Sequence, residues 1–160
     1  MDFESLARHI RAALPEAVLE EHAEALSPWL LVRRESLPEL ALLLRDDPAL
    51  AFNELMCLSG VHAPSAEGDR LWSVIHLFSQ AHRHKLGLKV VLEAADPRCP
   101  SVARVWPTAD WHEREAYDMV GIVYEGHPDL RRILCPDDWE GHPLRKDYAA
   151  PASYNGMPLD

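Results

Sequence analysis

Apolar residues near the amino terminus recur at intervals of three and four, which is the period of an amphipathic helix. Asp2 stands where it can cap this helix, and Pro15 stands where the helix should end. A second apolar stripe follows Ser36, whose spacing to Glu39 is that of a capping box, and it stops before Pro48. Two helices are therefore predicted in the first third of the chain. Their apolar stripes are Phe3, Leu6, Ala7, Ile10, Ala13 and Leu14 in the first, and Leu37, Leu40, Ala41 and Leu44 in the second.

Runs of β-forming residues lie between and after these helices. Residues 17–21 and 29–33 have the pattern of two short strands. Residues 71–78 are rich in β-formers, and residues 86–93 alternate strictly, with the period of a half-buried strand. The polar link between the last two runs predicts an antiparallel hairpin. The pattern over 52–61 fits a helix and a strand equally well.

The pattern changes after this hairpin. Closely spaced prolines leave room only for a short helical turn at 101–105. A third helix is predicted to begin at Asp110 as N-cap, with Glu113 as its capping-box partner and Gly121 as C-cap. After Val123 no period is visible. The fold class expected is α+β, with a mixed or antiparallel sheet, helices packed on one face and an irregular C-terminal wrap.

Glu113 has an unusual position on the third helix. On a wheel of 100° per residue it falls at roughly 200°, within the apolar arc. An unpaired buried carboxylate costs several kcal/mol, so we expect an ion pair with Arg131, Arg132 or Arg145. A catalytic acid/base and a carboxylate that faces a partner protein are the other two interpretations. The apolar arc contains His112, Ala116, Met119 and Val120, and the opposite side contains Trp111, Arg114, Glu115 and Asp118.

Length and composition set further bounds. The chain has 160 residues, of which 48% are hydrophobic, and we expect one domain over residues 1–148 followed by a short tail over 149–160. Lys and Arg number 16 and Asp and Glu 26, for a net charge of −10. This balance argues against nucleic-acid binding and suits a basic protein partner. No apolar run approaches the ~20 residues that cross a bilayer, so another chain would have to hold this one at a membrane.

The sequence shows no familiar spacing of metal ligands and no cofactor-binding loop. Cys57, Cys99 and Cys135 are far apart, and His82 and His84 lack a third ligand at a recognisable distance. Neither a glycine-rich nucleotide loop nor a G-x-S-x-G elbow is present. We therefore predict no catalytic, cofactor-binding or metal-binding residue in this chain. The two histidines that precede proline are expected to be structural.

One stretch, residues 111–148, carries a dense series of short motifs: E-R-E at 113–115, G-H-P-D-L-R-R-I-L at 126–134, D-D-W at 137–139 and G-H-P-L-R-K-D-Y at 141–148. This ordered series resembles the C subunit, also called the 30 kDa subunit, of the proton-pumping NADH-quinone oxidoreductase, bacterial respiratory complex I. The resemblance extends more loosely back to the strands that begin near Leu71. A long run of ordered matches is more specific than any single short motif.

The resemblance implies a cofactor-free component of the peripheral arm that docks on the D subunit. That neighbour, with the B subunit and its terminal iron–sulfur cluster, builds the quinone site, so FMN, the iron–sulfur clusters and quinone belong to the parent complex. The chain would support electron transfer from NADH to quinone within a hetero-oligomer, on the cytoplasmic side of the inner membrane, held there by its partners. The residues expected to form structural ion pairs or the partner interface are Glu113, Arg114, Glu115, Asp118, Arg131, Arg132, Trp139, Arg145, Lys146 and Asp147.

Two alternatives stay open. One is the same scaffold in a related ferredoxin-dependent dehydrogenase or membrane-bound hydrogenase. The other is a stand-alone acid/base enzyme that uses Glu113, Glu115 and Asp118. The segment from His127 onward is expected to be mainly an interface, because it is rich in Pro, Arg, Asp and Trp and lacks a period. Beyond Tyr148 we expect rapid amide exchange in the isolated chain and protection in a complex. Some relatives carry a longer tail, so the extent of that contact is left open.

Overall fold

The structure is a computed structural model that describes residues 1–65 and 68–159. A five-stranded mixed sheet in the order β1-β2-β5-β4-β3 forms its centre, which confirms the α+β class. The strands of this sheet are β1 (Val18–His22), β2 (Trp29–Val32), β3 (Glu54–His62), β4 (Arg70–Ser79) and β5 (His84–Glu93). The helices are α1 (Phe3–Ala13), α2 (Leu37–Asp46) and α3 (Ala109–Val120), with a 3-10 turn η1 (Arg34–Ser36) before α2. Short strands pair as β6 (Arg98–Pro100) with β7 (Val123–Glu125), and β8 (Ser153–Tyr154) with β9 (Met157–Pro158).

The predicted hairpin is confirmed as β4 and β5, which pair antiparallel from Arg70↔Glu93 to Ser79↔His84. The ambiguous run resolves as the strand β3, antiparallel to β4. β2 joins the other side of β5 in parallel. In β4 every second side chain is buried, so the sheet has one inward face.

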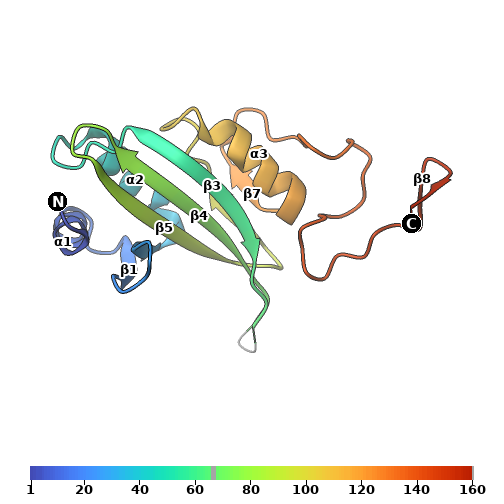
Figure 1. The fold of residues 1–160 in the computed structure, drawn as a ribbon, viewed down its shortest axis with the longest axis horizontal. Coiled ribbons are helices and arrows are strands. Elements are labelled where there is room, and N and C mark those ends of the chain that lie inside the picture. The colour runs from blue at the N-terminus through green and yellow to red at the C-terminus, as the bar shows by residue number, and fades with distance from the viewer. Residues whose placement is uncertain (66–67, 160) are drawn as a thin grey trace.

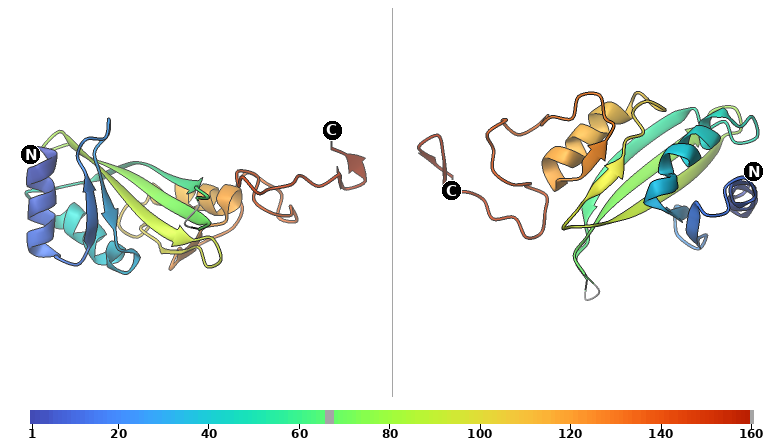
Figure 2. Two further views of the ribbon diagram at one scale, coloured as in Figure 1. Left: turned by 90° about the horizontal axis from the view of Figure 1, so that it is seen from below. Right: turned by 180° about the vertical axis from the view of Figure 1, so that it is seen from behind.

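The helices lie against that inward face. The right panel of Figure 2 shows α2 across the sheet, and Figure 1 looks onto the opposite face, which no described helix covers. The stripe predicted for α2 is fully buried, as are Leu30, Ile75 and Leu88 of the strands. Each buried leucine or isoleucine contributes about 1.5–3 kcal/mol relative to exposure. The predicted packing of helices on one face is therefore confirmed.

Only one of the three predicted helix N-caps is confirmed. The Asp2 carboxylate accepts a hydrogen bond from the Ser5 amide at 2.8 Å and caps α1. Ser36 makes no side-chain capping bond, because η1 runs straight into α2 and gives Ser36 a helical backbone instead of the extended one that a cap requires. Likewise α3 begins at Ala109, so Asp110 lies inside its first turn and forms no capping box with Glu113.

After β7 the chain is irregular, as predicted. Residues 126–159, here called the C-terminal segment, pass over α3 and then extend away from the sheet (Figure 1). The short turn predicted before α3 is present, and in it the Val105 and Trp106 amides both donate to the Val102 carbonyl at 2.9 Å. No helix among the described residues is long and apolar enough to cross a membrane. The division into a domain over 1–148 and a tail stays a prediction.

Candidate partner interface

Helix α3 connects the sheet to the C-terminal segment. On its sheet side, a Cβ atom at Gly60 of β3 would lie only 3.1 Å from the Ala116 Cβ and 3.3 Å from Val120. Gly60 therefore lets α3 approach the sheet closely. The opposite side of α3 faces the C-terminal segment, where Leu144 donates its amide to the Met119 carbonyl at 2.9 Å. One side of α3 thus packs on the sheet and the other on the C-terminal segment, which explains why so few of its residues are exposed.

Glu113 points from α3 toward the loop before it. Its side chain is fully buried and accepts hydrogen bonds from the Ser101 hydroxyl at 2.6 Å and the Val102 amide at 2.7 Å. The Nε2 atom of His127 lies 3.9 Å away. Burial raises the pKa of Glu113 to about 7, and the two hydrogen bonds only partly offset this rise.

The predicted burial of Glu113 is confirmed, but the prediction that it pairs with an arginine is wrong. Arg131 pairs with Asp129 and Arg145 with Asp147, while Arg132 binds a carboxylate on the other face of α3. Each of these arginines thus has a carboxylate partner other than Glu113. A hydroxyl and a backbone amide satisfy Glu113 instead.

Asp118 binds the C-terminal segment to α3. Its fully buried carboxylate accepts from the amides of Ile133, Leu134 and Cys135 at 2.7–3.0 Å and from the Arg132 guanidinium at 2.6 Å. Burial alone would raise the pKa of Asp118, but these four hydrogen bonds outweigh it and lower the pKa to about 2. One carboxylate thus fixes four consecutive residues of an otherwise irregular chain.

Arg132 extends this anchor along the chain. Its Nη2 atom donates to the carbonyls of Trp139 at 2.7 Å and Gly141 at 3.0 Å. Arg114, which the helical wheel places on the polar side, is buried because its guanidinium donates to the carbonyl of Arg132 at 3.2 Å beneath the segment. Glu115 is exposed on the same helix.

Both histidines that precede proline use their ring nitrogens within the chain. His127 donates from Nε2 to the Asp110 carbonyl at 3.1 Å, and His142 donates from Nδ1 to the Asp118 carbonyl at 3.0 Å. A third histidine, His62, has a role that sequence reasoning missed: its Nδ1 accepts the Lys146 amide at 2.8 Å. His62 lies in β3 with no motif around it, so only the tertiary structure reveals this contact.

The end of the segment is held by aromatic groups. Trp139 donates from Nε1 to the Tyr148 hydroxyl at 3.0 Å, and its ring lies 5.2 Å from that of Tyr154. The Tyr154 hydroxyl donates to Asp138 at 2.8 Å. These contacts stay within the segment, so they shape it without attaching it to the sheet.

Large apolar side chains remain exposed on α3 and the C-terminal segment. Trp111 is 63% exposed, Leu134 64%, Leu144 62% and Met157 61%. The backbones of Leu134 and Leu144 are anchored by the contacts above, while their side chains find no cover within the described chain. Exposed apolar surface of this kind is typical of a protein–protein contact.

The described residues offer no cluster of three or more His, Cys, Asp and Glu side chains that could hold a metal ion. The rings of His82 and His84 lie 5.4 Å apart, but their Nε2 atoms donate to the carbonyls of Pro48 and Leu50, both at 2.8 Å. His84 is buried beside the Phe52 ring, with ring centroids 4.7 Å apart.

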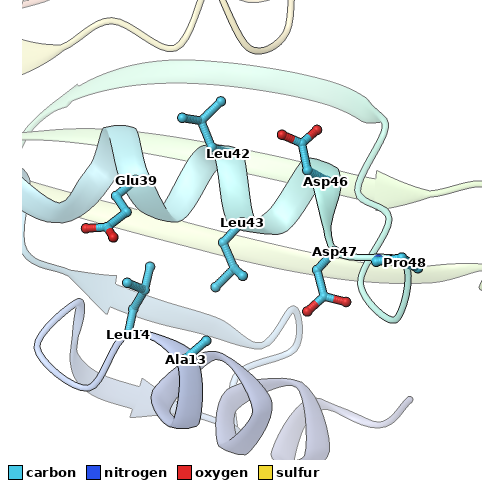
Figure 3. Close-up of a pocket in the computed structure, with 8 residues that line it drawn as sticks. All are labelled: Ala13, Leu14, Glu39, Leu42, Leu43, Asp46, Asp47 and Pro48. Atoms are coloured by element: carbon cyan, nitrogen blue, oxygen red, sulfur yellow. The ribbon is translucent and has the colours of Figure 1, made fainter.

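A groove of about 650 Å³ lies between α1 and α2 (Figure 3). Leu14 and Leu43 line it together with acidic side chains. Asp46 binds Arg45 at 2.6 Å, and Asp47 binds His9 at 2.7 Å. Asp46 and Asp47 therefore already have partners, and among the described residues this groove holds no group of three metal-ligating side chains.

Comparison with known proteins matches residues 30–154 to the family model described as respiratory-chain NADH dehydrogenase, 30 Kd subunit. The C subunit of the NADH-quinone oxidoreductase from Chloroherpeton thalassium is 48% identical over 153 residues, covering 94% of this chain and 62% of that protein. The corresponding C subunit from Acidothermus cellulolyticus is 49% identical over 146 residues, covering 89% and 76%. This chain therefore spans a little under two thirds of the first relative's length.

Two solved structures share the fold. A trypsin-resistant fragment of Nqo5 superposes with a TM-score of 0.63 at 28% identity, covering 81% of this chain and all of the fragment. A chain of the membrane-bound sulfane sulfur reductase, an archaeal respiratory membrane complex, superposes with a TM-score of 0.73 at 20% identity, covering 91% of this chain and 85% of that chain. The second likeness concerns the fold alone.

Proposed function

The chain belongs to the 30 kDa subunit family of the respiratory-chain NADH dehydrogenase, and we propose that it acts as the peripheral C subunit of a proton-translocating NADH:quinone oxidoreductase. In this role it docks on the D subunit, close to the B subunit, and supports the assembly in which electrons pass from NADH through iron–sulfur clusters to quinone. FMN, the clusters and the quinone reside in other subunits. The chain lies on the cytoplasmic side of the inner membrane and is held there by these partners.

One observation carries the docking role. The C-terminal segment is anchored to α3 through Asp118 and Arg132, yet it exposes Leu134 and Leu144. A segment that buries its polar backbone groups and exposes its leucines is built to bind another surface. The D subunit is the partner that the family resemblance suggests for it.

The acid/base alternative finds little support in the same geometry. Glu113 and Asp118 are fully buried on opposite faces of α3, and each is satisfied by hydrogen bonds within the chain. Glu115 is exposed, without the other two beside it. General acid/base catalysis needs groups that reach a common substrate atom, and these three do not converge.

The experiment is affinity purification of the tagged full chain from cells that express it with the rest of its complex. We expect it to co-purify with flavin-containing and iron–sulfur proteins in a fraction that oxidises NADH with quinone as acceptor. The isolated chain should show no stoichiometric iron, zinc or flavin. A chain that elutes alone and turns over a substrate would refute the proposal, whereas a complex that accepts electrons only from ferredoxin or hydrogen would favour the related scaffold.

A further inference from the structure

The sheet has a second face that no described helix covers, and Figure 1 looks directly onto it. We call it the open sheet face. The strand register places its side chains in rows across β2, β5, β4 and β3. They are half-buried by one another and remain in contact with solvent. Its central members are Trp29, Leu31, Trp72, Val74 and Lys89, and Phe78 and Lys85 lie nearer the hairpin turn.

Lys89 lies at the centre of the open sheet face between two indole rings. Its Nζ atom is 3.6 Å from the centroid of Trp29 and 4.1 Å from that of Trp72. The rings hold the ammonium by cation–π attraction and shield it from water. Burial lowers the pKa of Lys89, and in the described part of the chain no carboxylate lies within ion-pair distance of it.

This lack of a carboxylate contrasts with two arginines beside the sheet. Arg70 pairs with Glu93 at 2.6 Å, and Arg11 pairs with Glu21 at 2.5 Å. Acidic residues outnumber basic ones by 26 to 16 in this chain, so a carboxylate could readily have been placed beside Lys89. Instead, two indole rings position the ammonium on an uncovered face, where it is preorganised to bind a carboxylate of another protein.

We propose that the open sheet face is a second docking surface, which binds a segment of a neighbouring protein with an Asp or Glu carboxylate at Lys89 and apolar side chains over Trp29 and Trp72. The inference rests on the proposed function, since it assumes a hetero-oligomer. It adds an interface on the side of the sheet away from α3. Tryptophan is a residue type that dominates binding energy at such interfaces, and a single central charge gives the contact its register.

Other occupants fit the open sheet face less well. A second copy of this chain centred on Lys89 by a two-fold axis would bring Lys89 against Lys89. A polyanion such as nucleic acid needs several cations, whereas Glu20 and Glu93 lie at the margins of the face. One protein carboxylate within an apolar surround matches the Lys89 ammonium and the two indoles that flank it.

The first test is zero-length cross-linking of the purified complex with a water-soluble carbodiimide. The carbodiimide adds to a carboxyl group to form an O-acylisourea. The Lys89 amine then attacks the acyl carbon to form an amide, and a urea leaves with one of the carboxyl oxygens. We expect peptide mass spectrometry to find Lys89 joined to an Asp or Glu of another protein of the complex. Lys89→Arg keeps the charge but cannot form the amide, so it should abolish this cross-link. A cross-link to a second copy of the chain, or none in the intact complex, would overturn the inference.

The second test is competition for assembly. A tagged variant and untagged wild type are co-expressed at equal levels, and their ratio in the purified complex is measured. Lys89→Met should be depleted by at least about tenfold, as expected for loss of one partner of a desolvated charge pair. Lys89→Arg should compete within about twofold, which separates charge from packing. Arg8→Met, which removes an exposed cation on α1 outside the sheet, is the control and should also stay within about twofold.

These outcomes separate the inference from the proposed function. If wild type assembles and Lys89→Met assembles equally well, the open sheet face does not dock a carboxylate, while the proposed role in the complex stands. If the wild-type chain does not enter any complex, both are wrong. Thermal melts of the free variants should show folded proteins in each case, so that depletion reports binding.

Discussion

Two carboxylates five residues apart on α3 are both fully buried, yet their pKa values shift in opposite directions. Glu113 faces the sheet, accepts two hydrogen bonds and has its pKa raised to about 7. Asp118 faces the C-terminal segment, accepts four hydrogen bonds including one from Arg132 and has its pKa lowered to about 2. Burial acts on both in the same sense, so the number and charge of the donors decide which form is stable.

The difference separates two regions of the molecule. On the sheet side, Glu113 makes a polar contact in the core, and burial there favours its neutral, protonated form. On the segment side, Asp118 is an ionised anchor that keeps an irregular chain in place and so presents Leu134 and Leu144 outward. Both regions contribute to the stability of the fold, and the proposed assembly depends on the second.

Asp118→Ala should produce the largest loss of stability. It leaves the Arg132 guanidinium and the amides of Ile133, Leu134 and Cys135 without their acceptor. Removing one partner of a buried ion pair costs about 3–5 kcal/mol. Urea unfolding should show this loss, and hydrogen exchange should show faster exchange at residues 133–135.

Glu115→Ala on the same helix is the control for Asp118→Ala. Its side chain is exposed, so its free energy of unfolding should change by no more than about 0.5 kcal/mol. If Asp118→Ala unfolds at the same urea concentration as Glu115→Ala, the C-terminal segment is held to α3 by other contacts.

Glu113→Gln should change how stability depends on pH. Because the pKa of Glu113 is raised from 4.5 to about 7 on folding, the unfolded chain loses this proton first. Stability therefore falls as pH rises from about 4.5 to about 7, by about 3 kcal/mol for this group. Gln mimics the neutral acid, so the variant should match wild type near pH 4.5 and exceed it at pH 8. Parallel curves for the two proteins across this range would contradict the raised pKa.

Asp118 contributes with the opposite sign. Its pKa falls from 3.8 to about 2 on folding, so its stabilisation is complete above about pH 4 and is lost as pH falls toward 2. The pH ranges of the two groups barely overlap. The difference curve between Glu113→Gln and wild type therefore isolates Glu113.

The helical period predicted which side of α3 each residue faces but not what it meets there. It placed Glu113 among buried positions correctly, because that depends only on the spacing along one helix. Its partners Ser101 and Val102 come from a proline-rich loop whose path no period encodes. Arg114 looked exposed from the wheel and is buried, because its cover comes from a segment without secondary structure.

Local capping rules failed for a related reason. Ser36 and Thr108, the residues that precede α2 and α3, have helical backbone angles, because turns run directly into the helices. Capping boxes presume an extended residue at that point. The core leucines and the β4–β5 hairpin were predictable because binary patterning alone specifies them.

Gly121→Ala should have an intermediate effect. Gly121 ends α3 with φ +88°, and a Cβ there would lie 2.7 Å from the His142 ring. Backbone strain and displacement of His142 together should cost about 1–3 kcal/mol in urea unfolding. Gly126→Ala is the matched control, since φ is +81° but no atom lies within 4 Å of its added Cβ. It should show the backbone cost alone, and equal losses would mean that the His142 contact contributes nothing.

Leu134→Ser and Leu144→Ser should have the smallest effect on the free chain and a large effect on assembly. Their side chains are 64% and 62% exposed, so unfolding free energies should change by about 0.5 kcal/mol or less. If a partner buries them, each loses roughly 1.5–3 kcal/mol of apolar burial in the complex. Incorporation in competition with wild type should then fall about tenfold or more. Leu26→Ser, at a fully exposed leucine in the β1–β2 turn, should compete equally with wild type.

If all three variants compete alike, the exposed leucines of the C-terminal segment do not contact the partner. The docking surface would then have to lie elsewhere, with the open sheet face around Lys89 as the remaining candidate.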